Sequence, residues 1–313
     1  MENFIDIRNV VKQYDGHRAL NGVSMTVPQG SVYGLLGPNG AGKTSLIRII
    51  NRITRPDSGE VWLDGHQITD DDVAHIGYLP EERGLYKKMK VADHIVYLAR
   101  LKGMTKADAL AETYRWLDRF DLRQWHNKKV EALSKGMQQK VQFIATVIHR
   151  PKLLILDEPF SGFDPINADQ LKAEILGLRD EGSTILFSTH NMESVESICD
   201  HITLINHAEA VLQGRVDQIR QSHKKNIIGI ETPADLPAND SLYSILPPPA
   251  EQPDAKRVRL AAGVTIREAI TWLNENIDLR GFREILPSMH EIFVETVKGK
   301  QPEPPQADNN EKS

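Results

Sequence analysis

Hydrophobic and polar residues alternate along the first part of the chain. Segments 4–14 and 23–30 place apolar side chains at every second position for much of their length, which is typical of half-buried strands. Asp15 and Gly16 lie between these segments and form a dipeptide that favours a hairpin turn. Another short strand is expected at 60–63, between two groups of turn residues. The pattern therefore predicts an N-terminal antiparallel β subdomain.

Nearly continuous apolar runs alternate with helical patterns in the rest of the first 220 residues. The expected strands are 31–36, 152–156, 184–189, 202–206 and 210–213, the last two as a hairpin. Helical spacing of apolar residues is found at 43–51 and 167–181. Strands that alternate with helices indicate an α/β domain with a largely parallel sheet.

A mostly helical insert of about sixty residues interrupts this alternation. From about residue 88 to residue 150, apolar residues recur at helical spacing in the segments 91–101, 106–120 and 136–149. These segments predict a helical subdomain within the α/β domain.

The composition changes at 222–225, and a smaller unit follows. Its expected strands are 226–232, 257–262 and 281–286, and its expected helices are 265–277 and 288–299. We therefore predict a first domain at 1–221 and an accessory α+β domain at 222–299. The last residues, 300–313, are polar and rich in proline, and we expect them to be disordered.

Composition narrows the class of protein. Hydrophobic residues make up 40% of the chain and charged residues 26%, which is ordinary for a globular protein. The formal net charge of -5 weighs against nucleic acid as a partner, because nucleic-acid binders usually carry a basic surface. No segment approaches the roughly 18–20 apolar residues of a membrane helix. The first residues lack the pattern of a signal peptide, and the single cysteine excludes an intramolecular disulfide, so we expect a cytoplasmic protein.

A glycine-rich segment follows the strand expected at 31–36. It reads GPNGAGKT and matches G-x-x-x-x-G-K-[ST], in which backbone N–H groups and the next helix's dipole hold phosphate oxygens. The pattern predicts that Lys43 reaches the β- and γ-phosphates and that the Thr44 hydroxyl binds Mg²⁺. An ordinary glycine-rich turn is the alternative, but the strand before the loop and the helix after it favour a nucleotide site. The candidate nucleotide-binding residues here are Gly37, Pro38, Asn39, Gly40, Ala41, Gly42, Lys43, Thr44 and Ser45.

Two carboxylates end the apolar strand at 152–156. The segment reads LLILDEP, and a charge at the end of a buried strand is costly unless a cation or a partner is present. Asp157 is positioned to hold Mg²⁺, and Glu158 is the candidate general base for a water that attacks the γ-phosphate. Two solvent-exposed acids at a strand end are the alternative, which the nearby phosphate loop disfavours.

His190 follows the strand expected at 184–189. Catalytic groups gather at the carboxyl ends of strands in sheets of this type, so His190 is a candidate sensor of the γ-phosphate. A histidine at a strand end is often only structural, and this interpretation depends on its spacing from the other motifs.

The order of further motifs resembles that of ABC ATPases over about residues 1–220. Segment 133–139 reads LSKGMQQ, about twenty residues before LLILDEP, and is similar to the family's signature motif; SGFDP at 161–165 and STH at 188–190 follow in the family's order. The resemblance implies a P-loop NTPase with a RecA-like core, and a head-to-tail dimer with two ATP molecules at its interface. Ser134 and Gly136 would then contact the γ-phosphate bound to the other subunit. A role for Ser134 as a helix N-cap is the alternative, and both roles can hold together.

The resemblance also assigns roles to two further residues. Asp164 would link the two ATP sites across the dimer. Tyr14 matches the aromatic position that stacks on adenine, and a generic surface or core tyrosine is the less favoured alternative.

Three residues depart from the family's pattern. Glu81 stands where glutamine is usual after the strand near residue 80; a carboxylate is also a hard oxygen ligand, so contact with Mg²⁺ can survive. Lys135 and Met137 replace the commonest glycine and glutamine of the signature. Because Ser134 and Gly136 are retained, we expect ATP binding to persist, whereas a hydrogen bond from the usual glutamine is in doubt.

The favoured interpretation is therefore the ATP-hydrolysing subunit of an ABC transporter, with ATP and Mg²⁺ as its ligands. The resemblance implies a membrane-spanning permease partner docked near Glu81, a second ATPase subunit of the same or another chain, and a place on the inner face of the cell membrane. The part after residue 222, and YLPEERGLY at 78–86, are similar to bacterial drug- and sodium-exporter ATPases.

Two alternatives to a transporter subunit remain. A soluble ABC ATPase acting on ribosomes or nucleic acid usually has two cassettes or coiled-coil arms, and a non-hydrolysing regulatory subunit is disfavoured by Glu158 and His190.

Overall fold

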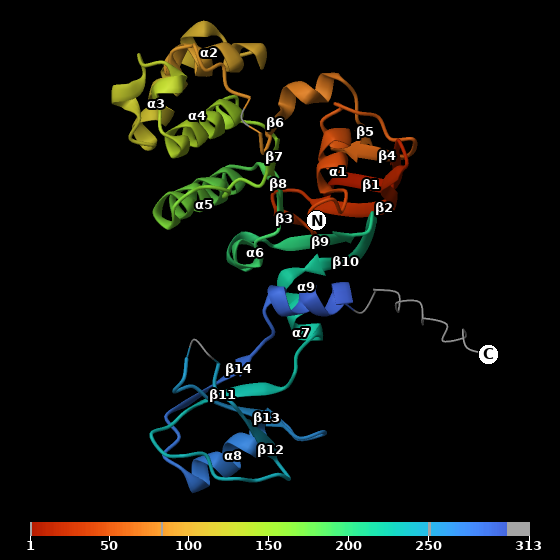
Figure 1. Ribbon diagram of the computed structural model, residues 1–313, viewed down its shortest axis with the longest axis vertical. Helices are drawn as coiled ribbons and strands as arrows, with labels where there is room; N and C mark the ends of the chain where they lie inside the picture. The colour runs from red at the N-terminus through yellow and green to blue at the C-terminus, as the bar shows by residue number, and fades with distance from the viewer. Residues whose placement is uncertain (1, 83, 250–251, 299–313) are drawn as a thin grey trace, which may run out of the picture. The chain divides into compact units, whose positions relative to one another are not determined.

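The computed structural model describes residues 2–82, 84–249 and 252–298 and divides into two compact units (Figure 1). The N-terminal unit comprises Met1–Val216 and the C-terminal unit comprises Asp217–Ser313. Within the described ranges, none of the helices combines the length and the apolar character of a membrane span. The tail predicted at 300–313 lies outside the described residues.

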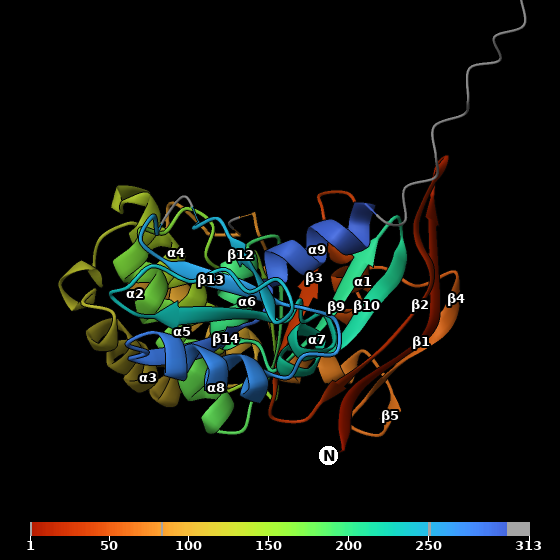
Figure 2. The same cartoon turned by 90° about the horizontal axis from the view of Figure 1, so that it is seen from below.

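An antiparallel sheet of order β2-β1-β4-β5 begins the N-terminal unit, as predicted. Its strands are β1 (Asn3–Tyr14), β2 (His17–Pro28), β4 (Ser58–Leu63) and β5 (His66–Gln67). The hairpin turn expected at Asp15-Gly16 is confirmed, because Tyr14 pairs with His17 across it. The second strand starts at His17 rather than at residue 23, so the hairpin is longer than its apolar alternation indicates (Figure 2).

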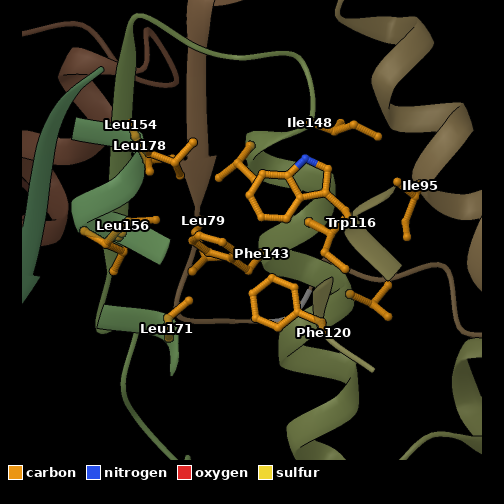
Figure 3. Close-up of a cluster of buried hydrophobic side chains, with 14 of the residues drawn as sticks. Leu79, Ile95, Trp116, Phe120, Phe143, Ile148, Leu154, Leu156, Leu171 and Leu178 are labelled. Carbon is orange, nitrogen blue, oxygen red and sulfur yellow. The ribbon is translucent and has the colours of Figure 1, made fainter. Parts of the chain in front are cut away.

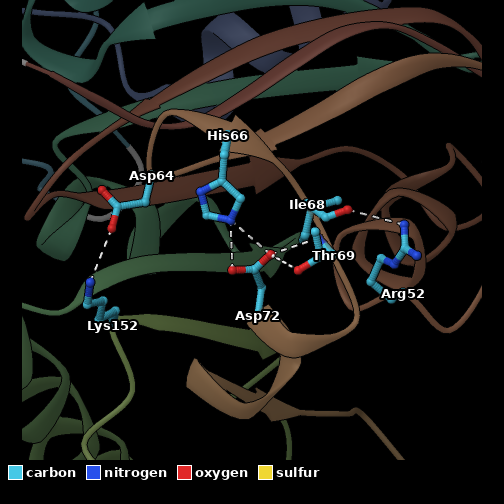
Figure 4. A network of polar contacts seen from close by, with 7 residues as sticks. All are labelled: Arg52, Asp64, His66, Ile68, Thr69, Asp72 and Lys152. Atoms are coloured by element: carbon cyan, nitrogen blue, oxygen red, sulfur yellow. Dashed lines mark hydrogen bonds and ion pairs between the residues drawn. The ribbon is translucent and has the colours of Figure 1, made fainter.

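A polar network fixes the segment after β5 (Figure 4). The Asp72 carboxylate accepts hydrogen bonds from the Thr69 backbone N–H at 2.7 Å and interacts with His66 Nε2 at 3.0 Å. Asp72 belongs to the 3-10 helix η1 (Asp71–His75), which leads directly into β6. This network therefore anchors the approach to one strand of the central sheet.

The central sheet has six strands in the order β10-β9-β3-β8-β7-β6. They are β3 (Val32–Leu36), β6 (Ile76–Leu79), β7 (Leu153–Asp157), β8 (Thr184–Thr189), β9 (His201–Asn206) and β10 (Glu209–Arg215). All neighbours pair in parallel except the β9–β10 hairpin. Strands buried on both faces explain the continuous apolar runs of the sequence.

Helices cover both faces of the central sheet (Figure 1). They are α1 (Lys43–Ile50), α2 (Val91–Leu101), α3 (Lys106–Arg119), α4 (Lys135–Val147), α5 (Pro165–Asp180) and α6 (Met192–Ile198). Alternate residues of one strand enter different cores: Leu153 and Ile155 pack with α1, whereas Leu154 and Leu156 pack with α4 and α5. The predicted helical insert is formed by α2, α3 and α4, and its core contains Trp116, Phe120 and Phe143 in mutual ring contact (Figure 3).

The C-terminal unit is an α+β structure with a four-stranded antiparallel sheet of order β12-β13-β11-β14. Its elements are α7 (Val216–Ser222), β11 (Ile227–Glu231), β12 (Tyr243–Leu246), β13 (Lys256–Leu260), α8 (Ile266–Asn276), β14 (Gly281–Ile285) and α9 (Met289–Lys298). A capping box of Thr265 and Glu268 starts α8, which packs its buried Ala269 and Leu273 on one face of the sheet. The sequence pattern missed α7 and β12; β12 has four residues and precedes three prolines.

Candidate functional site

The glycine-rich loop connects β3 to α1, as predicted, and its backbone requires glycine at two positions. Gly37 and Gly42 have φ angles of 150° and 115°. A Cβ atom would lie 2.2 Å from the Ile205 carbonyl oxygen at Gly37 and 2.3 Å from the Ala19 carbonyl oxygen at Gly42. Any side chain at these positions would therefore push the loop away from the strands that support it.

The loop presents donors that suit an anion. The N-cap of α1 is Gly42, and no side chain of the described residues caps the first N–H groups of this helix. These groups therefore stay available to a ligand, as in anion sites at helix N-termini. The buried Lys43 ammonium donates hydrogen bonds to the carbonyl oxygens of Gly37 at 2.6 Å and Pro38 at 3.1 Å. Burial lowers the pKa of Lys43, and the nearby carboxylates of Glu158, Asp157 and Glu81 oppose this shift.

One cavity of about 360 Å³ brings most of the predicted site residues together. It is lined by Tyr14, His17, Ala19, Asn39, Gly40, Ala41, Gly42, Lys43, Thr44, Ser45, Glu81, Asp157, Glu158 and His190. Gly37 and Pro38 are not in this lining, but their carbonyl oxygens hold the Lys43 ammonium. His17 and Ala19 were missed, because the sequence pattern gave no reason to join β2 to the glycine-rich loop.

Asp157 is the last residue of β7 and is almost fully buried. In the parallel register it lies beside Ser188 of β8, whose hydroxyl donates a hydrogen bond to its carboxylate. Burial raises the pKa of Asp157, and the hydroxyl groups of Ser188 and Thr44 and the charge of Lys43 oppose this shift. The carboxylate thus lies close to both the loop lysine and the Thr44 hydroxyl.

Glu158 turns away from the strand and is held by the end of β8. Its φ angle of 50° is unusual for a residue with a side chain and costs about 1–2 kcal/mol. Its backbone N–H donates to the Ser188 carbonyl oxygen at 3.1 Å. Its carboxylate accepts from Thr189 Oγ1 at 3.3 Å and contacts His190 Nδ1 at 2.8 Å. Because an ionised carboxylate only accepts hydrogen bonds, Nδ1 of His190 carries the proton in this pair.

Two predicted residues extend the cavity at its edges. Tyr14 ends β1 with an exposed ring, and the Lys12 ammonium lies 5.5 Å from the ring centroid. Glu81 follows β6 and lies near enough to Lys43 to influence its charge. A smaller cavity of about 180 Å³ connects Glu81, Asp157 and Glu158 to Lys135 of α4.

The remaining predicted residues lie outside the cavity that contains Lys43. Ser134 is the N-cap of α4 and accepts a hydrogen bond from the Met137 N–H at 3.3 Å. A Cβ atom at Gly136 would meet no heavy atom within 4 Å among the described residues. Asp164 is the exposed N-cap of α5, and hydrogen bonds from Asn167 lower its pKa. One chain therefore assembles the phosphate loop and the acidic strand at one site, but Ser134 and Gly136 of the signature motif do not line that cavity.

Comparisons with known proteins identify the family of the chain. The family described as ABC transporter matches residues 20–161, and the C-terminal domain of DrrA1-3-like ATP-binding proteins matches residues 214–297. The chain is 42% identical over 293 residues to YhaQ, an uncharacterized ABC transporter ATP-binding protein of Bacillus subtilis, covering 94% of this chain and 98% of that protein. It is 29% identical to the daunorubicin resistance ATP-binding protein DrrA3 of Streptomyces coeruleorubidus, covering 93% and 94% of the two chains.

Solved structures of ABC transporter subunits share the fold of this chain. A solved structure of the ATP-binding subunit of an ABC transporter superposes with a TM-score of 0.66 at 27% identity, covering 70% of this chain and 92% of that one. The predicted P-loop NTPase fold is therefore confirmed. ATP hydrolysis that energises transport through a membrane partner is the general activity of these subunits. The chain belongs to the family of ABC transporter ATP-binding proteins.

Proposed function

We propose that the cavity at the glycine-rich loop binds Mg-ATP and that Glu158 is the base for its hydrolysis. The observation that supports this proposal is the meeting of the loop, Asp157, Glu158 and His190 around one cavity of about 360 Å³. Backbone N–H groups and Lys43 would hold the phosphates. Tyr14, exposed at the edge of the cavity, would stack on the adenine.

The residues present suit Mg²⁺. The Thr44 hydroxyl and the Asp157 carboxylate lie together, and the Glu81 carboxylate lines the same cavity. Mg²⁺ prefers oxygen ligands and usually takes one or two carboxylates together with substrate phosphates and water. When bound, the ion would neutralise charge on the phosphate oxygens.

Glu158 would take the proton of the attacking water. The contacts with His190 and Thr189 hold its carboxylate in one orientation, which a base needs in order to act on one water molecule. His190 is exposed toward the cavity, so its ring can contact both Glu158 and the γ-phosphate.

Lys43→Ala tests the binding site. Removing the ammonium should weaken binding of Mg-ATP by a factor of ten or more, because a charge-assisted hydrogen bond contributes about 1.5–3 kcal/mol. Calorimetric titration measures this loss, and Lys128→Ala, at an exposed lysine, serves as the control. Equal affinities of wild type and Lys43→Ala would show that the loop does not hold the nucleotide.

A second copy of the chain, or a related ATPase subunit, would complete the site. Ser134, Gly136 and Asp164 lie at or near helix N-termini outside the cavity, and Ser134 and Asp164 are exposed. A head-to-tail arrangement would bring Ser134 and Gly136 to the γ-phosphate of the facing subunit, where the first N–H groups of α4 add donors. Asp164 would then lie between the two sites.

The permease would dock in a largely apolar groove between β6 and the helical insert. The groove has a volume of about 310 Å³, and its lining includes Tyr78, Leu85, Leu98, Leu101 and His149. The Gln142 side-chain amide of α4 donates to the Pro80 carbonyl oxygen at 3.1 Å, next to Glu81. Occupation of the groove could thus be transmitted to the nucleotide cavity through a direct contact.

Leu101→Glu tests this docking site. Leu101 is 64% exposed, so the charge should leave the fold intact but oppose an apolar partner. Leu110→Glu is the matched control, because Leu110 is 40% exposed on α3 and is not in the groove lining. We expect loss of co-purification with the permease only for Leu101→Glu. Equal recovery of the permease with both variants would place docking elsewhere.

We further propose that the transporter is an exporter and that 222–299 acts as an accessory domain to an ATPase domain at 1–221. The match of the C-terminal unit to the DrrA1-3-like domain, and the likeness to a protein named for daunorubicin resistance, support this direction. We place the subunit on the inner face of the cell membrane. ATP-dependent uptake of a substrate into inverted membrane vesicles tests export, because uptake by such vesicles corresponds to export from cells.

A further inference from the structure

The two faces of the sheet in the C-terminal unit differ in chemistry. One face carries Ile228, Val258 and other apolar side chains against α8. On the opposite face, Gly229 of β11 pairs with Arg257 of β13 on one side and with Arg283 of β14 on the other. Directly paired residues share a face of a sheet, so two arginines flank one glycine.

Gly229 leaves the space between the two arginines of this face without a side chain. A Cβ atom at Gly229 would lie 3.4 Å from Arg283 Cγ and 3.5 Å from Arg283 Nε. The Arg283 side chain therefore lies close to the glycine backbone, in the space that a side chain at position 229 would share. Arg259, two residues after Arg257 on β13, lies on the same face.

The guanidinium groups of this face form no ion pair with a carboxylate of the described residues. Arg257 Nε is buried and makes no hydrogen bond, and within the described ranges the side chains of Arg259 and Arg283 make no hydrogen bond or ion pair. Arg257 does donate through Nη2 to the Pro247 carbonyl oxygen. Guanidinium groups stay charged at any physiological pH, so neighbouring unpaired arginines repel one another.

Carboxylates line the same space, but two of the four are engaged elsewhere. Glu284 pairs with Lys224 at 3.7 Å, and Glu291 accepts the Ser288 backbone N–H at 2.8 Å. Glu231 and Asp254 are the other two acids of the lining. Arg257 and Arg283 thus share this cavity with four carboxylates but form no close ion pair with any of them among the described residues.

A cavity of about 1100 Å³ lies over this face. Its lining includes Arg220 of α7 and Ser288 in addition to Gly229, Arg257 and Arg283. Guanidinium groups bind phosphate oxygens through two parallel hydrogen bonds, and a hydroxyl group adds a further donor. The space is large enough for a phosphate group together with the molecule that carries it.

We propose that the arginine face of the C-terminal unit binds a phosphate-bearing ligand, held by Arg257 and Arg283 above Gly229. The phosphate can belong to a soluble phosphoester or to the headgroup of an anionic lipid, because both present the same oxygens to a guanidinium pair. This site is separate in sequence from the nucleotide loop and does not depend on ATP hydrolysis.

The test uses the full chain saturated with Mg²⁺ and a non-hydrolysable ATP analogue, which occupies the nucleotide loop. Inorganic pyrophosphate is then titrated by calorimetry, and sedimentation is measured with vesicles of phosphatidylglycerol or of phosphatidylcholine. The variants are Arg257→Gln, Arg283→Gln and both together. Arg267→Gln is the control, because it removes the same charge from an exposed position on α8.

Each of the two substitutions should weaken binding about tenfold, and Arg267→Gln should leave it unchanged. Pyrophosphate binding with this dependence identifies a soluble ligand; binding only to phosphatidylglycerol vesicles, with the same dependence, identifies a lipid. Arg283→Gln changes an exposed side chain, so it keeps the test valid if Arg257→Gln fails to fold. The proposal is overturned if neither probe binds, or if binding survives the double substitution or weakens equally in the control.

Discussion

Replacing Glu158 by glutamine should separate ATP hydrolysis from ATP binding. The side-chain oxygen of glutamine can still accept the hydrogen bond from His190 Nδ1, which spans 2.8 Å in the wild type. The geometry of the pair therefore persists, while the basic carboxylate is lost. Positioned general bases contribute about 10²–10⁴ to a rate, so turnover should fall by about that factor, or about 3–5 kcal/mol.

The same substitution should not weaken the binding of Mg-ATP. Glu158 is the strongest of the carboxylates that favour the charged form of Lys43, but it also adds negative charge to a cavity that must accept polyphosphate. Removing this charge reduces repulsion of the phosphates, so the affinity for Mg-ATP should be equal to or higher than that of the wild type. ATP held without hydrolysis should also favour the dimer.

The assay combines steady-state phosphate release, calorimetric titration with Mg-ATP and light scattering. Glu193→Gln, at an exposed glutamate in the first turn of α6, is the control. His190→Ala should reduce turnover by itself, and its combination with Glu158→Gln should be no worse than Glu158→Gln alone, because the two residues act as a unit. Normal turnover of Glu158→Gln, or additive losses in the double variant, would refute the assignment of the base.

Two predictions concern stability. Burial lowers the pKa of the His94 imidazole from 6.5 to about 4, so between these values the unfolded chain takes up a proton that the folded chain does not. Stability should therefore fall as the pH decreases, by about 2 kcal/mol for this group at pH 5. Urea unfolding at pH 7 and pH 5 should show a smaller loss for His94→Leu; the same loss in both proteins would contradict this reasoning. Phe143→Ala should cost about 3–5 kcal/mol, because Phe143 is 1% exposed and packs against Trp116 and Phe120. Ile53→Ala, at a residue that is 56% exposed, should change the urea midpoint little, and equal midpoints for the two variants would be the contrary result.

Elements with a strong local pattern could be predicted from the sequence. The helix expected at 91–101 coincides with α2, and the strand expected at 184–189 coincides with β8. Both carry a long, regular arrangement of apolar residues, so burial reinforces the local preference. β5 and β12 have two and four residues, and a pattern this short cannot be distinguished from a turn. Their pairing depends on strands that are distant in the sequence.

The arrangement around Glu158 also depends on strands that are distant in the sequence. The sequence places Asp157 and Glu158 at the end of a strand, but it does not indicate which other strand lies next to that strand in the sheet. In the structure β7 and β8 are adjacent, Asp157 pairs with Ser188, and the same register brings Thr189 and His190 to Glu158. The left-handed backbone of Glu158 could not be predicted either, because glutamate rarely adopts it without tertiary constraints.

The motif residues divide according to whether folding of one chain suffices to bring them together. Lys43, Asp157 and His190 follow different strands of one parallel sheet, and the carboxyl ends of such strands meet at one edge. Ser134 instead caps a helix of the insert, and its hydroxyl oxygen accepts a hydrogen bond from the Met137 N–H of that same helix. The parallel sheet therefore explains why Lys43, Asp157 and His190 meet at the cavity, but it gives no reason for a serine at this N-cap to approach a phosphate. A role for Ser134 in nucleotide binding thus requires a facing surface, which is why its assignment depends on a second subunit whereas that of Lys43 does not.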